Sequence, residues 1–185
     1  SSWVESNTAR AGSGIDAAGF AELTVADSWV RRNVADEFGG GLRVGFVAEA
    51  TLTNTEVQAN EAPVGGGLLI DGADIGAVRL ANLSISNNSA KVRGAALAVV
   101  GGSSVQIERL QLVANEVVEG SGTLAVSSGS TVSFGASATA CSDVTVITDW
   151  TETSKRCSPI PQGINAGLLC SESWRSCHDA EDGTW

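Results

Sequence analysis

The segment VQANEAPVGGGLLI, residues 57–70, places an asparagine and three successive glycines between two apolar runs. Three glycines in a row lose much conformational entropy on folding, so their position directly before an apolar run needs a structural reason. The same order of residues recurs at residues 30–44, 85–99 and 112–126, with a more divergent copy at residues 4–15. The segment is therefore one copy of an internal repeat.

Each copy can be aligned on one asparagine, which an aliphatic residue precedes by three positions. Of the neighbouring pair Asn87 and Asn88, only Asn88 keeps this apolar register. The aligned asparagines are spaced by 26, 27, 28 and 27 residues, and they are Asn7, Asn33, Asn60, Asn88 and Asn115. A repeat of about 27 residues that covers most of a chain is typical of a solenoid.

Three short apolar runs in each repeat are suited to strands. Val78, Leu80, Leu83 and Ile85 are predicted to point inward, and the break in alternation between Leu80 and Leu83 predicts a bend. One such unit cannot bury its apolar side alone, whereas stacked units bury a continuous core. The sequence therefore predicts an all-β, right-handed, single-stranded parallel β-helix of about five coils.

The recurring asparagines and glycines are interpreted as structural. Asparagine tolerates the left-handed backbone conformation, so each repeat asparagine is predicted to occupy a bend. Stacked amides can also hydrogen-bond along the column and form an asparagine ladder. The glycines are predicted to permit a second bend and a close approach between coils.

Composition excludes some functions. The 185 residues are 43% hydrophobic, enough for a substantial core, and carry a net charge of −10. Phosphate backbones would repel such a chain, so we expect no nucleic-acid partner. No apolar run approaches the ~20 residues of a membrane span, so we expect no membrane insertion. Because SSWVESN begins inside a repeat, we expect further sequence before residue 1.

All four cysteines lie after the repeats, which predicts two disulfides and an oxidising compartment. The simplest pairings are Cys141–Cys157 and Cys170–Cys177, but three connectivities are open. A zinc site that includes His178 is the competing interpretation, although no spacing fits the C-x₂₋₄-C of common zinc modules.

The chain is accordingly divided into β-helix repeats, residues 1–140, and a cysteine-containing cap or interaction segment, residues 141–185. Glycosylation sequons at Asn82 and Asn87 agree with an extracellular or cell-surface location. The acidic stretch HDAEDG, residues 178–183, lacks a complete calcium-loop pattern, so no metal or cofactor is predicted.

Parallel β-helices also include polysaccharide lyases and hydrolases, which need clustered carboxylates. The best candidates are Asp71 and Asp74, with Arg43 and Lys91 on adjacent coils. Two carboxylates in a glycine-rich turn are more often turn formers, and NTE at residues 54–56 has no accompanying motif. No catalytic residue is assigned, and a polysaccharide-processing enzyme is kept as the alternative function.

The tryptophans and threonines are candidate binding residues. Trp3 and Trp29 fall near corresponding coil positions, where they cover the edge of the column or contact a partner. Thr51 and Thr53 have no matching threonines in the next two coils, which argues against ice binding. The tail tryptophans are interpreted as packing residues rather than a sugar site, and they are Trp150, Trp174 and Trp185.

Two short motifs recur in order. The first is GSGI at residues 12–15, GGGL at residues 39–42 and 65–68, and GAAL at residues 94–97. The second is VRRN, VQAN, ISNN or LVAN. They resemble the GGA[ILV] and FxxN motifs of the polymorphic outer-membrane protein repeat of bacterial surface adhesins and autotransporter passengers, with an aliphatic residue in place of phenylalanine. The resemblance covers residues 3–135 and implies a pectin-lyase-like parallel β-helix with an adhesive or structural role at the cell surface.

The sequence thus leads to the hypothesis of a non-enzymatic, extracellular structural or adhesive module, as a subunit or fragment of a filament or larger surface protein. Its expected partners are other protein subunits or cell-surface ligands. The open first coil and the C-terminal segment are the expected contact regions.

Overall fold

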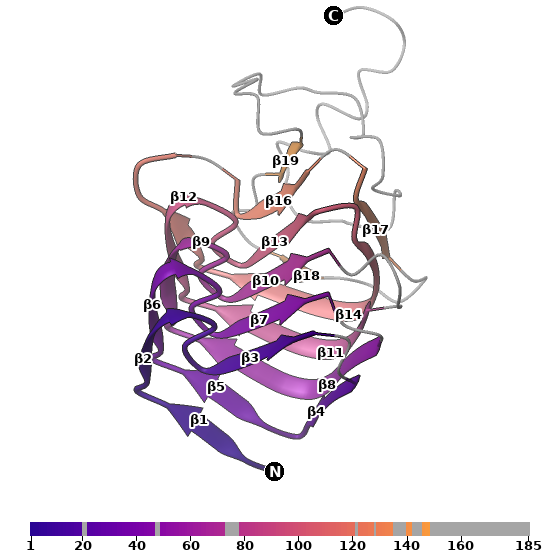
Figure 1. Ribbon diagram of the computed structural model, residues 1–185, viewed down its shortest axis with the longest axis horizontal. Coiled ribbons are helices and arrows are strands. Elements are labelled where there is room, and N and C mark those ends of the chain that lie inside the picture. The colour runs from indigo at the N-terminus through magenta and orange to yellow at the C-terminus, as the bar shows by residue number, and fades with distance from the viewer. Residues whose placement is uncertain are drawn as a thin grey trace, which may run out of the picture.

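The computed structural model describes residues 1–19, 22–46, 49–72, 78–120, 122–127, 129–134, 140–141 and 146–148. These residues form an all-β parallel solenoid of about four turns and contain no helix (Figure 1). The prediction of about five coils is too high, because five equivalent asparagine positions enclose only four complete turns. Within the described residues there is no helix with the length and apolar character needed to cross a membrane.

Three parallel sheets form the walls of the solenoid. Sheet A consists of β1 (Trp3–Glu5), β4 (Glu22–Ala26), β5 (Trp29–Arg31), β8 (Glu49–Gln58), β11 (Val78–Ser86), β14 (Ser104–Val113), β17 (Thr131–Phe134) and β18 (Ala140–Cys141). Sheet B consists of β2 (Thr8–Ala11), β6 (Val34–Phe38), β9 (Glu61–Val64), β12 (Ser89–Arg93) and β15 (Glu116–Val117). Sheet C consists of β3 (Ile15–Ala18), β7 (Leu42–Gly45), β10 (Leu68–Asp71), β13 (Leu97–Val100), β16 (Leu124–Val126) and β19 (Val146–Thr148).

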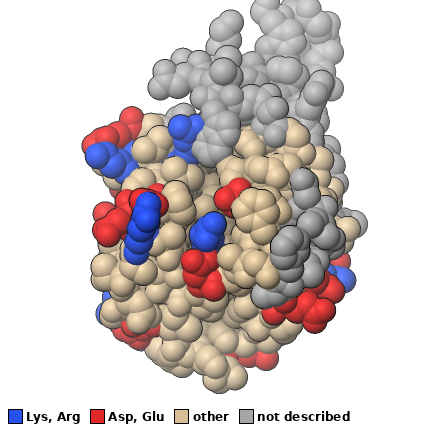
Figure 2. Space-filling view, viewed as in Figure 1, with Lys and Arg blue, Asp and Glu red and all other residues tan. Residues whose placement is uncertain are grey.

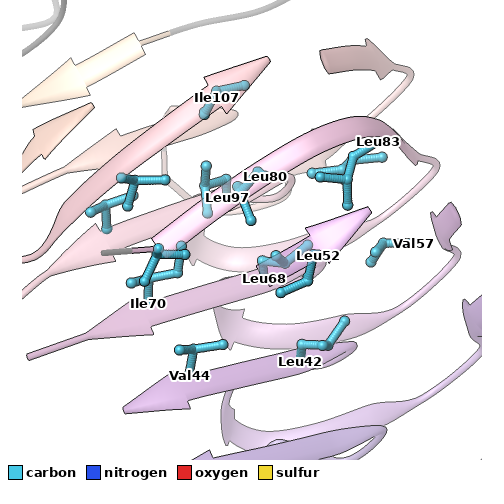
Figure 3. Packing of buried hydrophobic residues seen from close by; sticks show 14 of the residues in the cluster. Leu42, Val44, Leu52, Val57, Leu68, Ile70, Leu80, Leu83, Leu97 and Ile107 are labelled. Carbon is cyan, nitrogen blue, oxygen red and sulfur yellow. The ribbon is translucent and has the colours of Figure 1, made fainter. Parts of the chain in front are cut away.

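The core lies between the sheets and is built from aliphatic residues in parallel register. Leu42, Leu68, Leu97 and Leu124 align across β7, β10, β13 and β16 and are fully buried. Figure 3 shows side chains from β7 and β10 directed toward Leu52 and its neighbours in sheet A. Each fully buried leucine contributes roughly 1.5–3 kcal/mol relative to an exposed one. Stacking in register therefore joins the few apolar side chains of each repeat into one continuous core.

The predicted bend within sheet A is confirmed. Val78, Leu80, Leu83 and Ile85 are all buried, and the intervening Asn82 has a left-handed φ of 53°. The two short strands expected on either side run together as the single bent strand β11. The bends of β8 and β14 come at the equivalent residues, Asn54 and Arg109.

The repeat asparagines form a hydrogen-bonded column through the interior. Asn33 Oδ1 accepts from the backbone N and the Nδ2 of Asn7, both at 3.0 Å. Its own Nδ2 donates back to the Val4 carbonyl at 3.2 Å and forward to Asn60 Oδ1 at 2.9 Å. The same pattern continues through Asn88 and Asn115. Each interior asparagine thus connects its coil to both neighbours.

The prediction that the repeat asparagines themselves occupy a left-handed bend is wrong by one residue. The left-handed positions are those immediately before each repeat asparagine, and they are Ser6, Arg32, Ala59, Asn87 and Ala114. The amide of the repeat asparagine is used between coils and does not close its own turn. Its burial explains why Asn88, at 1% exposure, belongs to the column whereas its exposed neighbour Asn87 does not.

Glycines permit close contact where the chain passes from sheet B to sheet C. A Cβ added to Gly66 would lie 2.2 Å from the Ser89 carbonyl oxygen of the next coil. Gly65, just before it, has a left-handed φ of 66°. The glycine-rich run therefore combines a turn with a contact that leaves no room for a side chain.

A second, smaller apolar cluster lies on the outer side of sheet C and was not predicted. Leu69, Ala98 and Ala125 alternate with the core residues and yet are buried. Phe38 and Val64, from the ends of β6 and β9, pack against them.

Ion pairs add contacts between neighbouring coils on the outside. Examples are Arg10 with Glu37 and Lys91 with Glu119, whose charged atoms lie 2.7 and 3.6 Å apart. Figure 2 shows basic and acidic side chains next to one another on the face of the solenoid that is turned to the viewer. The separations in sequence are close to one repeat, so each pair favours the correct stacking register.

Most of the predicted C-terminal segment lies outside the described residues. Cys141 is in β18, whose backbone aligns with Leu112 of β14. Other residues with a predicted role also lie outside the described part of the chain, and these are the disulfide partners Cys157, Cys170 and Cys177, the zinc and calcium candidates at 178–183, and Trp150, Trp174 and Trp185.

Candidate ligand-binding groove

A groove, here called the lateral groove, crosses the outer face of sheet A where β8, β11 and β14 bend. It encloses about 510 Å³ and is open to solvent. Each of the three coils contributes three residues at equivalent positions, and these are Asn54, Thr55 and Glu56; Asn82, Leu83 and Ser84; and Arg109, Leu110 and Gln111. The middle residue of each triplet is buried, so the exposed lining comes from the first and third positions.

One edge of the lateral groove carries a row of polar side chains at the left-handed bend, here called the bend row. Asn82 Nδ2 donates to Asn54 Oδ1 at 2.8 Å, and Asn54 Nδ2 donates to Asp27 Oδ1 at 3.0 Å. Arg109 continues the row in the next coil. Among the described residues, the Arg109 side chain has no hydrogen bond or ion pair, so its guanidinium donors are available to a ligand.

The opposite edge forms a second row, here called the tryptophan row. Strand register aligns Trp3 with Trp29, Trp29 with Glu56, and Glu56 with Ser84 and then Gln111. The Trp3 and Trp29 ring centroids are 4.9 Å apart with their planes at 30°. The two tryptophans predicted to lie near corresponding coil positions are therefore direct neighbours, and they extend the polar edge of the groove into an aromatic surface.

Charged residues fix the aromatic end of this row. The Arg31 guanidinium carbon lies 4.2 Å from the Trp3 ring centroid, a cation–π contact, and its Nη2 lies 2.9 Å from Glu5 Oε2. The hydrogen bond from Arg31 is the main cause that lowers the pKa of Glu5, and the charges of Arg31 and Arg32 act in the same direction. Glu5 therefore stays ionised and holds Arg31 against the indole. Trp3 nevertheless remains 56% exposed.

The residues proposed for the enzymatic alternative that the structure describes are divided between two walls of the solenoid, sheets B and C. Asp71 ends β10 in sheet C, and Arg43 of the same sheet lies 3.2 Å from Asp16. Lys91 is in sheet B, where it pairs with Glu119. Asp74 lies outside the described residues. Nor do the described residues include a group of three or more side chains suited to holding a metal ion.

Both predicted sequons are exposed at left-handed positions. Asn82 lines the lateral groove, and its amide nitrogen is used in the bend row. Asn87 lies at the next turn, beside the buried column. Their glycosylation stays a prediction.

Sequence reasoning missed the groove, although a signal for it was present. The bend-row residues each precede a repeat asparagine by six positions, and they are Asp27, Asn54, Asn82 and Arg109. Three of the four have the short polar side chains that favour the left-handed conformation.

Comparisons with protein-family models, curated proteins and solved structures found no match to this chain.

Proposed function

We propose that this chain is a non-enzymatic adhesive module of a cell surface or extracellular assembly, and that the lateral groove is its ligand-binding surface. The observation that carries the proposal is the open groove on a side wall of the solenoid, lined by polar side chains at equivalent positions of three successive coils. A regular side wall of this kind presents a ligand with several equivalent contacts.

The internal polar groups have a different role. The buried amides of Asn33, Asn60 and Asn88 bond to the coils before and after them, so they serve folding. The groove side chains at the first and third positions of each triplet lie outside the core, where substitution is tolerated. This division lets the solenoid keep its stability while its binding surface varies.

The resemblance of the repeats to the polymorphic outer-membrane protein motifs supports the same function, together with a right-handed, pectin-lyase-like winding. The four cysteines and the two sequons support an extracellular location. A role as a filament subunit would instead rely on contacts through the ends of the solenoid, whereas the groove favours binding from the side.

An adhesion assay tests the proposal. Beads coated with the full chain would be applied to mammalian cells, bacterial cells and matrix-protein surfaces, and attachment under flow would be counted. The double variant Arg109→Ala/Gln111→Ala should lose attachment, whereas Lys91→Ala in sheet B should retain it. Equal attachment of all three proteins, or attachment to no surface, would contradict the adhesive function.

The polysaccharide-processing alternative needs its own measurement. The full chain would be incubated with neutral and acidic polysaccharides, and new reducing ends and unsaturated products would be followed. We expect no reaction. Reproducible cleavage that is lost in Asp71→Asn would replace the adhesive proposal with an enzymatic one.

A further inference from the structure

We propose that the lateral groove and the Trp3–Trp29 pair together bind a neutral glycan chain that lies across the coils. This inference rests on the proposed adhesive function and adds the chemical class of the ligand.

The site has the length of an extended oligomer. The tryptophan row runs from Trp3 through Trp29, Glu56 and Ser84 to Gln111, one residue for each coil. At a strand spacing of ~4.8 Å, its four intervals span roughly 19 Å. A sugar unit in an extended glycan is about as long as one strand spacing, so successive units would meet successive coils.

The side chains match the chemistry of sugars. Sugar hydroxyls both donate and accept hydrogen bonds, and the groove offers both kinds of partner through Asn54, Asn82, Ser84 and Gln111. The apolar C–H faces of sugar rings pack against aromatic rings, and the exposed Trp3 supplies such a surface at the end of the row.

A peptide strand fits this surface less well. Strand addition requires a sheet edge with free backbone N–H and C=O groups. The lateral groove instead crosses the face of sheet A, where β8, β11 and β14 are already paired with one another. Binding must therefore come from side chains, which favours a ligand covered with hydroxyl groups.

The charge of the site favours a neutral glycan over an acidic one. Within the groove lining, Glu56 and Arg109 offset each other, and Arg31 at the aromatic end is already paired with Glu5. The whole chain carries a net charge of −10, which repels uronic-acid or sulfated polymers.

The test is binding of the full chain to soluble neutral polysaccharides (glucans, mannan, xylan, galactan and chitin oligosaccharides) and to polygalacturonate as the acidic probe. Affinity would be measured by affinity electrophoresis and by titration calorimetry. We expect at least one neutral probe to bind and polygalacturonate not to bind. Binding of the acidic probe alone, or of no probe, would overturn the inference.

Variants locate the site. Arg109→Ala and Gln111→Ala change exposed residues. Each should raise the Kd about tenfold, which corresponds to about 1.4 kcal/mol of binding free energy. Trp29→Leu should weaken it by at least as much, with circular dichroism showing that the solenoid is retained. Lys91→Ala is the matched control on sheet B and should stay within about twofold. Unchanged affinity in all the groove variants would place the glycan elsewhere and overturn the inference.

The two proposals fail separately. If groove variants abolish attachment of coated beads but no glycan binds, the adhesive function stands and the ligand class is wrong. If a neutral glycan binds in the groove but coated beads attach to no surface, the glycan site stands and the adhesive function is wrong.

Discussion

Replacing Asn60 with alanine would remove a side chain that joins three coils. Asn60 Oδ1 accepts from the backbone N and the Nδ2 of Asn33, at 3.0 and 2.9 Å. Its Nδ2 donates to the Val30 carbonyl and to Asn88 Oδ1, both at 3.0 Å. The substitution therefore deletes four hydrogen bonds at a residue that is 1% exposed.

The expected cost follows from these four bonds. The Asn33 N–H would lose its acceptor in a buried site, at about 1–3 kcal/mol, and each of the other three bonds contributes about 0.5–1.5 kcal/mol net. Together these values give roughly 2.5–7.5 kcal/mol. For a chain of this length, where each kcal/mol corresponds to ~2–4 °C, the Tm should fall by roughly 5–30 °C.

The assay is thermal and guanidinium unfolding followed by the strand signal in circular dichroism. Gln58→Ala is the control, because Gln58 is a half-buried amide residue of the same coil outside the column. It should change the unfolding free energy by no more than about 0.5 kcal/mol. If Asn60→Ala were no less stable than Gln58→Ala, the asparagine column could not be a main support of the fold.

Three further substitutions test other parts of the structure. Gly66→Val should lower the Tm and cost at least about 1–3 kcal/mol of unfolding free energy, because its Cβ would meet the Ser89 carbonyl; an unchanged Tm would refute the tight contact. Leu80→Ala should cost about 2–5 kcal/mol in denaturant unfolding, and a loss below about 1 kcal/mol would show that the core there collapses around the gap. The pKa of Glu5 lies below its ordinary 4.5 because of Arg31, so its stabilising contribution is present above that pH and is lost as the pH falls through the lowered pKa. Glu5→Gln should therefore reduce the acid dependence of the Tm, and an identical pH profile would count against this ion pair.

The fold could be predicted from the sequence because a solenoid repeats each weak signal. A single VxxN or GGGL means little, but their recurrence at 26–28 residues fixes which residues share a position in successive coils. Inward residues such as Leu80 and Ile85, and the choice of Asn88 over Asn87, follow from that alignment.

The details that were missed depend on contacts between coils. The repeat asparagine could have closed its own turn or bonded to its neighbours, and only the positions of backbone groups such as the Val30 carbonyl decide between these uses. Strand alternation places Leu69 on the outer side of sheet C, yet Phe38 and Val64 from sheet B pack against it. The groove could not be predicted for a related reason: Arg109 and Gln111 belong to no distinctive motif, and they join Asn54 and Asn82 only where the coils stack.

The asparagine column also gives the solenoid a direction. Along it, each amide oxygen receives donors from the coil before, and each amide nitrogen points to the oxygen of the coil after. A coil placed before Asn7 in the same sense would repeat this order, with donors for Asn7 Oδ1 and a carbonyl for Asn7 Nδ2, whereas a coil placed in the opposite sense would not. Continuation of the column by duplication of coils therefore keeps one direction along the solenoid. The asparagine of each coil therefore sets the direction of stacking as well as hydrogen-bonding the coil to its neighbours.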